Sequence, residues 1–231
     1  MNMDCFLKRY TSFLMKDEGD SLFESFKFIL GGTTSPRIGK LLNFAVSQMG
    51  HDECYVETGV FTGGTLIPAS WNNGRVCIGI DPYEGMIESS DYLFIKEQAQ
   101  RNMKTMSPNS KLIEKDFRNV TKEEIGMPIA VSFIDAMHNF NGVYDNLSWL
   151  HPLLADHAVI VFDDINFLEV SQAIAQWLKE HGETYDLTAY IKPFYKDENY
   201  ISSISDRFLN NGICILRYHK DAIPLGIVAV P

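Results

Sequence analysis

The stretch from Cys54 to Gly64, CYVETGVFTGG, constrains the fold of this chain more than any other. Residues that suit a buried strand run from Cys54 to Glu57 and lead into a turn that contains Gly59 and Gly63, and a helix-compatible run follows at Thr65–Ser70. Glycine lets the backbone approach a ligand where a side chain would block it. This order of strand, glycine turn and helix is typical of a nucleotide site in a parallel α/β sheet.

The alternation of strand-like and helix-like runs continues along the chain, and the last two strand-like runs have no convincing helix between them. This order predicts one α/β domain over residues 33–231, a doubly wound, mostly parallel Rossmann-like sheet of seven strands with helices on both faces. We expect strands at Cys54–Glu57, Val76–Asp81, Lys111–Glu114, Ile129–Asp135, Ala158–Asp163, Asp186–Ile191 and Gly212–Arg217.

Residues 1–32 are predicted to form a helical N-terminal extension, because apolar residues recur at helical spacing in two runs. The stripes are Phe6, Tyr10, Phe13 and Leu14, then Leu22, Phe26, Ile29 and Leu30. We expect them to pack on the main domain; a lid over the active site and a dimer contact are the alternatives. A third helix should follow, capped by Ser35 and ended by Gly50. Walls of a substrate pocket are expected from residues 1–32 and from the long loop Pro193–Asn210.

Acidic residues follow the second and third predicted strands. Asp81 comes about 20 positions after Gly59, where an acid in such folds accepts the ribose hydroxyls of a nucleotide. Asp116 and Phe117 lie just past the third strand. Because parallel strands end at the same edge of a sheet, a cofactor site is predicted there, over strands one and four. The alternative for Asp81 is that it only caps the turn that follows it.

With these residues the chain resembles, from about Thr33 to Arg217, the class I S-adenosylmethionine (SAM) dependent methyltransferases. The resemblance implies the strand order 3-2-1-4-5-7-6. It also implies the cofactor-binding residues: Glu57 and Gly59 at the methionine end of SAM, Asp81 at the ribose, Asp116 and Phe117 at the adenine, with Thr58 and Gly63 in the same turn. A nicotinamide dehydrogenase is disfavoured, because the turn reads Glu-x-Gly-x-x-x-Gly and not Gly-x-Gly-x-x-Gly.

Three carboxylates are predicted to meet next to this cofactor. Asp135 ends the fourth strand, and Asp163 and Asp164 end the fifth. Neighbouring strands lie about 4.8 Å apart, so the three side chains should converge and repel one another. A hard divalent cation such as Mg²⁺, Mn²⁺ or Ca²⁺ would remove that repulsion. The alternative is that the aspartates only cap the following helices.

A bound cation would lower the pKa of an acceptor hydroxyl and hold its oxygen in line with the methyl group. His138 is the candidate base, because imidazole titrates near neutral pH; a structural histidine is the alternative. Asp135 with His138, followed by Asp163 and Asp164, resembles the metal-dependent O-methyltransferases of natural-product tailoring, a branch akin to catechol O-methyltransferase. The chain departs from that pattern at Ala136, where glycine is usual, and at Asp156-His157, where a Gly-Gly turn often precedes the fifth strand. Outside these motifs, surface or packing roles are expected for His51, Asp145, His151, His157, His181 and His219.

The expected function is therefore that of a SAM-dependent O-methyltransferase that acts on a hydroxylated small molecule with the help of Mg²⁺. The alternatives are a SAM methyltransferase that needs no metal, and a non-catalytic interaction protein built on this fold. A formal net charge of −10 over 231 residues argues against a nucleic-acid partner. Because the cysteines are scattered, and no signal peptide or long apolar run is visible, we expect a cytoplasmic protein without a membrane contact. A homodimer is compatible with the sequence.

Overall fold

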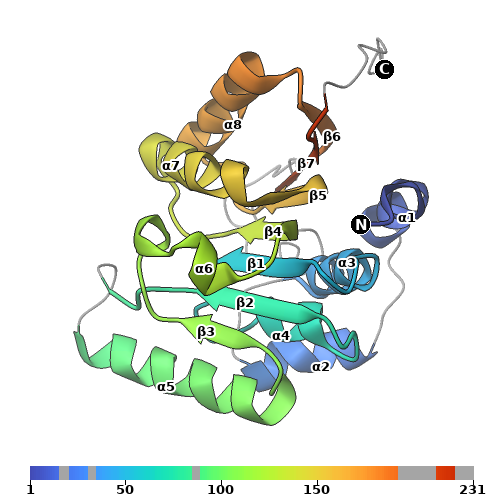
Figure 1. Ribbon diagram of the computed structural model, residues 1–231. Helices are drawn as coiled ribbons and strands as arrows, with labels where there is room; N and C mark the ends of the chain where they lie inside the picture. The colour runs from blue at the N-terminus through green and yellow to red at the C-terminus, as the bar shows by residue number, and fades with distance from the viewer. Residues whose placement is uncertain (16–20, 31–34, 85–88, 192–211, 222–231) are drawn as a thin grey trace, which may run out of the picture.

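The computed structural model describes residues 1–231 except for 16–20, 31–34, 85–88, 192–211 and 222–231 (Figure 1). The predicted loop Pro193–Asn210 thus lies outside the described residues. In chain order the elements are α1 (Met3–Met15), α2 (Ser21–Leu30), α3 (Pro36–Ser47), β1 (Cys54–Thr58), α4 (Leu66–Ser70), β2 (Val76–Ile80), α5 (Ser89–Met106), β3 (Lys111–Ile113), the 3₁₀ helix η1 (Phe117–Asn119), α6 (Lys122–Ile125), β4 (Ile129–Ile134), α7 (Phe140–Leu150), the 3₁₀ helix η2 (His151–Leu153), β5 (Leu154–Phe162), α8 (Leu168–His181), β6 (Tyr185–Ile191) and β7 (Ile213–His219).

All these strands form one sheet of order β3-β2-β1-β4-β5-β7-β6, which confirms the predicted order. The first five pair in parallel, while β7 is antiparallel to both β5 and β6. The start of the fifth strand differs from the prediction. β5 begins at Leu154 instead of Ala158, because Leu154 pairs with Ile129 and His157 pairs with His219 on β7. Asp156 and His157 therefore lie inside the strand and not in a turn before it.

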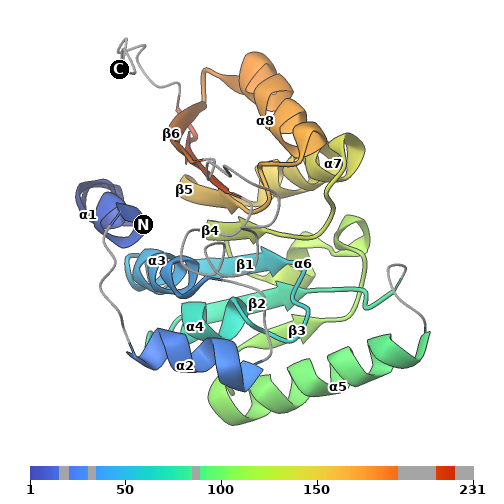
Figure 2. The same ribbon diagram turned by 180° about the vertical axis from the view of Figure 1, so that it is seen from behind.

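Helices cover both faces of the sheet (Figures 1 and 2). Alternate residues of each strand point to opposite faces, so the sheet separates two apolar cores. Tyr55 of β1 packs into the core formed with α1, α2, α3 and α4. Its neighbours Cys54 and Val56 pack into the second core, which is formed with α6, α7 and α8. This arrangement confirms a doubly wound α/β fold.

The N-terminal helices pack on the main domain, as expected. Phe6 and Leu30 are fully buried. The predicted packing was wrong for two residues of the second stripe. Leu22 and Ile29 are 40% and 58% exposed, and Phe23 is buried instead. The register of a short helix on a surface is set by its contacts, which a repeat of apolar residues alone does not fix.

The helix α1 starts at the end of the sheet where β1 begins, since the N–H of Asn2 donates to the carbonyl of Gln48, 2.8 Å away. Farther along, the hydroxyl of Tyr10 donates to the carbonyl of Thr188 on β6. The glycine turn lies at the opposite end of β1. This position argues against α1 as a lid over that turn, and the dimer contact stays a prediction.

The third helix begins as predicted but ends earlier. The Oγ of Ser35 accepts a hydrogen bond from the N–H of Arg37. The helix stops at Ser47 and not near Gly50, because the N–H groups of Gln48 and Met49 turn back to the carbonyls of Ala45 and Val46 in a tighter final turn. Among the described residues, none of the helices combines the length and the apolar character that crossing a bilayer requires.

Candidate active site

The glycine turn joins β1 to α4 and packs tightly against the end of β4. Gly59 has a φ of 88°, and a Cβ at this position would lie 2.2 Å from the backbone oxygen of Asp135. Gly63 has the same φ of 88°. The N–H of Asp135 donates to the carbonyl of Thr58 at 2.9 Å, so the turn is fixed to the neighbouring strand. Only glycine satisfies both the backbone angle and the close approach at position 59.

Three residues other than glycine also adopt the left-handed backbone region at this edge of the sheet, the left side of Figure 1. The φ angles are 51° at Phe61, 50° at Tyr83 and 58° at Asp164. Such conformations cost of order 1 kcal/mol or more and persist only where the surroundings hold them. They follow the ends of β1, β2 and β5, where ligands of parallel α/β sheets bind.

Asp81, at the end of β2, holds the glycine turn from the side. Its Oδ2 accepts hydrogen bonds from the N–H groups of Val60 and Phe61 at 2.9 and 3.0 Å. Its Oδ1 accepts one from the N–H of Tyr83 at 2.8 Å. A carboxylate offers about four lone-pair sites, so Asp81 keeps room for a ribose hydroxyl while it fixes the turn.

Glu57 lies beneath the turn and is fully buried. Its two oxygens accept hydrogen bonds from the hydroxyls of Tyr55 and Thr65, each at 2.5 Å. Burial raises the pKa of Glu57 to about 8. Both carboxylate oxygens of Glu57 thus already bond to neighbouring hydroxyls. The contact of Glu57 with the methionine end of SAM stays a prediction.

Thr58 points to the other face of the sheet. Its Oγ1 accepts a hydrogen bond from the side-chain amide of Asn146 on α7, 2.8 Å away, and both residues are buried. The structure thus brings Thr58 to the turn through its backbone, while its side chain serves contacts between the strand and the helix.

Asp116 follows β3 and forms a two-bond ion pair with Arg118, whose Nε and Nη2 lie 2.9 and 2.6 Å from its oxygens. The hydrogen bonds from this guanidinium lower the pKa of Asp116. The ring of Phe117 is buried in the core against Trp149, so little of it is free for a ligand. An open hollow of about 470 Å³ adjoins these residues. It is lined by Pro82, Glu84, Glu114, Lys115, Asp116 and Asn119.

The predicted acidic cluster lies at the ends of β4 and β5, and His138 lies close to two of its members. Nε2 of His138 lies 2.5 Å from Oδ2 of Asp164 and 3.6 Å from Oδ1 of Asp135. Within the described part of the chain these three residues form a group whose ligand atoms all lie within 4.8 Å of one another. Asp163 is 6% exposed, and its Oδ1 accepts a hydrogen bond from the N–H of Asp164. The structure therefore brings Asp135 and Asp164 together with His138, and places Asp163 beside the group.

Burial and the neighbouring charges both shift the pKa values of this group. Contacts with Asp135 and Asp164 raise the pKa of His138 to about 10. Burial raises the pKa of Asp135, although a quarter of its side chain stays exposed, and burial followed by the charge of Asp135 raises the pKa of Asp163. The repulsion expected from the sequence is thus present. The Nε2 of His138 makes no well-directed hydrogen bond despite the short contact with Asp164. Two carboxylate oxygens and one ring nitrogen that converge in this way fit a divalent cation.

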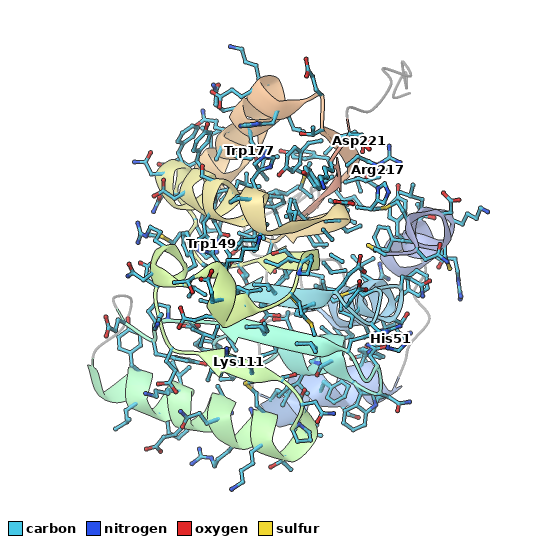
Figure 3. All side chains as sticks on the ribbon, viewed as in Figure 1. His51, Lys111, Trp149, Trp177, Arg217 and Asp221 are labelled. Atoms are coloured by element: carbon cyan, nitrogen blue, oxygen red, sulfur yellow. The ribbon has the colours of Figure 1, made fainter. Side chains whose placement is uncertain are left out.

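The other histidines lie outside this site. His51 is exposed on the turn before β1, at the far end of the sheet (Figure 3). His181 stacks on Trp177, and Nδ1 of His151 lies 2.7 Å from the hydroxyl of Tyr185. His157 and His219 contact each other across β5 and β7.

Two contributors to the site were missed by sequence reasoning. Asn146 is a polar residue on the buried face of α7, between Val143 and Leu147, and this position was a usable signal. Tyr83 gave no signal, because nothing in the local sequence indicates that its side chain turns back to the glycine turn.

The comparisons with known proteins agree with the fold. Residues 56–165 match the family model described as a methyltransferase domain. No curated protein sequence matches the chain significantly. Among solved structures, cofactor-bound Rv0187 from MTB aligns with a TM-score of 0.65 at 15% identity, over 95% of this chain and 96% of that one. The O-methyltransferase from Bacillus cereus in complex with SAH has a TM-score of 0.61 at 14% identity, over 91% and 96%. TomG, an O-methyltransferase of Streptomyces achromogenes involved in tomaymycin synthesis and solved with SAM, has a TM-score of 0.59 at 16% identity, over 95% and 99%.

At these identities the solved structures show the fold alone. The matched family model runs from within β1 to just past the end of β5, and this segment contains the glycine turn and the acidic group. The match spans just under half of the chain, and within it residues 56–165 resemble a methyltransferase domain; the strand order agrees with that resemblance.

Proposed function

We propose that the protein transfers a methyl group from SAM to a hydroxyl of a small molecule, with a divalent cation held by Asp135, His138 and Asp164. The observation that carries the proposal is the convergence of these three side chains within 4.8 Å of one another. Their place next to the glycine turn adds support, because the carbonyl of Asp135 touches the position of Gly59. Two of the similar structures are named O-methyltransferases.

SAM would lie over the turn from Gly59 to Gly63. Asp81 has a lone pair left for the ribose, and the hollow beside Asp116 has the size of a small-ligand pocket. The methyl group would then face the ends of β4 and β5, where the acidic group lies. This arrangement supports the cofactor role predicted for these residues.

The cation would lower the pKa of the acceptor hydroxyl and neutralise the charge that develops on its oxygen. Asp135 and Asp164 would hold the cation through oxygen atoms, and Asp163 lies beside them. The predicted role of His138 as base requires a ring nitrogen that is free to accept a proton, and its Nε2 lies between the two carboxylates. We therefore assign His138 to the ligand group.

A second candidate is methyl transfer without a metal. One observation favours it: a protonated His138, with its pKa near 10, would itself neutralise Asp135 and Asp164. In this case the three residues form an ion-paired group that needs no cation.

Removal of metal separates the two candidates. The purified protein is dialysed against a chelator and assayed with SAM and a panel of phenols and sugars, with and without added Mg²⁺ or Mn²⁺. We expect turnover that is lost on dialysis and restored by the cation, while binding of S-adenosylhomocysteine is unchanged. Full turnover after dialysis selects the metal-independent enzyme. Failure to bind S-adenosylhomocysteine selects a non-catalytic role.

The acceptor is proposed to be a hydroxylated small molecule rather than a nucleic acid, which a chain with a net charge of −10 would repel. A cytoplasmic setting and a homodimer are further proposals.

A further inference from the structure

Tyr83 contacts the glycine turn from outside β1. Its N–H donates to Asp81, and its hydroxyl reaches back and donates to the carbonyl of Phe61 at 3.1 Å. The side chain is only 7% exposed. The loop after β2 therefore contacts the turn after β1 through a residue to which the predicted cofactor contacts assign no role.

The turn depends on this contact, because both backbone polar groups of Phe61 are engaged by the loop after β2. The N–H of Phe61 donates to Asp81, and its carbonyl accepts from Tyr83. Both Phe61 and Tyr83 hold φ angles near 50° (51° and 50°), which side chains rarely adopt. A strained pair persists where surrounding contacts fix it. The hydroxyl of Tyr83 and the carboxylate of Asp81 are the contacts that do so here.

The donor role of Tyr83 does not depend on pH in the working range. Burial, followed by the charges of Asp81 and Glu57, raises the pKa of the Tyr83 hydroxyl above its usual value. The hydroxyl thus stays protonated and can donate wherever the protein is folded.

We propose that Tyr83 is a positioning residue for the cofactor, which holds the turn in its binding form through the carbonyl of Phe61. The inference rests on the proposed function, since it concerns the turn over which SAM would lie. Fixing a binding loop before the ligand arrives improves affinity, because the ordering cost is not taken from the binding energy. Tyr83 acts through Phe61 and is not required to touch SAM.

The chain offers a matched control for a test. Tyr83→Phe removes one hydroxyl that donates to a backbone carbonyl at 3.1 Å. Tyr10→Phe removes the same kind of bond, to the carbonyl of Thr188 at 3.0 Å, on α1 and β6 and away from the turn. The two variants lose similar hydrogen bonds, so a general loss of stability affects both.

The probe is S-adenosylhomocysteine, titrated calorimetrically into wild type and both variants. We expect affinity to fall about fivefold in Tyr83→Phe, the equivalent of one hydrogen bond of about 1 kcal/mol, and to stay unchanged in Tyr10→Phe. The KM for SAM should rise in Tyr83→Phe while kcat at saturating SAM is retained. Amide hydrogen exchange of Val60 to Thr62 should be faster in this variant without ligand.

Two results overturn the inference while the proposed function stands: wild-type affinity in Tyr83→Phe, or an equal loss in Tyr10→Phe. If the wild-type protein itself does not bind S-adenosylhomocysteine, the proposed function fails together with the inference.

Discussion

The backbone carbonyl of Asp135 occupies the space that a side chain at Gly59 would need. A Cβ at position 59 would lie 2.2 Å from that oxygen. The first residue of the turn and the first residue after β4 are thus in direct contact. Because Asp135 also belongs to the acidic group, the cofactor turn and the proposed cation site share one wall.

Gly59→Ala should therefore cost both stability and cofactor binding. A left-handed backbone costs about 1–2 kcal/mol and overpacking a further 1–3 kcal/mol, so we expect unfolding free energy to fall by about 3 kcal/mol. Gly74→Ala is the control, since Gly74 has a φ of 61° but open space around its Cβ position. Urea unfolding and titration with S-adenosylhomocysteine measure both effects. Equal losses in the two variants would show that the contact with Asp135 does not matter.

Glu57→Gln tests the raised pKa of the buried Glu57 carboxyl through the pH dependence of stability. The folded protein keeps the proton of Glu57 up to pH about 8, whereas the ordinary pKa of this group is 4.5. Between these values the folded state binds more protons, so its stability falls as pH rises, by at most about 1.4 kcal/mol per pH unit. The glutamine in the variant does not titrate, so its contribution to stability does not change with pH.

The stability of the variant relative to wild type should thus increase from pH 5 to 8. Above pH about 8 this difference in stability should become constant. Thermal unfolding across this range measures it, with Glu97→Gln on the exposed face of α5 as the control. A difference between Glu57→Gln and wild type that is constant over the whole range would contradict the raised pKa.

Thr58→Val tests whether the hydroxyl of Thr58 contributes to the stability of the fold or to cofactor binding. The change keeps the shape of the side chain but removes the acceptor for the amide of Asn146, whose Oδ1 already has no partner. An unsatisfied buried amide costs about 1–3 kcal/mol, so the unfolding free energy should fall by that amount. Thr58→Ser keeps the hydroxyl, so its unfolding free energy should fall by less. Affinity for S-adenosylhomocysteine should stay unchanged in both, and a clear loss in Thr58→Val alone would place this hydroxyl in the cofactor site.

His138→Gln distinguishes the two roles proposed for this residue. If His138 is a metal ligand, its replacement should weaken Mn²⁺ binding as well as turnover. Titration of Mn²⁺ into the variant measures the first and a methyl-transfer assay the second. Metal binding that is kept while turnover disappears would instead assign His138 as the base.

The order of the elements could be predicted because each strand and helix carries its own periodicity, and parallel pairing then brings strand ends to one edge. This is why Gly59, Asp81 and Asp135 were placed together from sequence. The start of β5 was missed because Asp156 and His157, near its beginning, are exposed and resemble a turn. Their strand conformation comes from pairing with β4 and β7, which no local pattern encodes.

The composition of the acidic group was harder to predict for a similar reason. Asp163 and Asp164 are adjacent in sequence and chemically identical. They differ in backbone conformation, since Asp164 has a left-handed φ of 58°. The carboxylate of Asp164 contacts His138, while that of Asp163 accepts a hydrogen bond from the backbone N–H of Asp164. The sequence identifies the pair Asp163 and Asp164, but the contacts of each carboxylate depend on the three-dimensional structure.

Calorimetric titration of Mn²⁺ into wild type, Asp164→Asn and Asp145→Asn tests the central claim most directly. Asp145, an aspartate on α7 that contacts Arg118, is the control for a general change of charge. We predict one cation bound per chain in wild type and in Asp145→Asn, and an affinity more than about tenfold lower in Asp164→Asn. Absence of Mn²⁺ binding in wild type, or equal binding in Asp164→Asn, would contradict a cation held by this group.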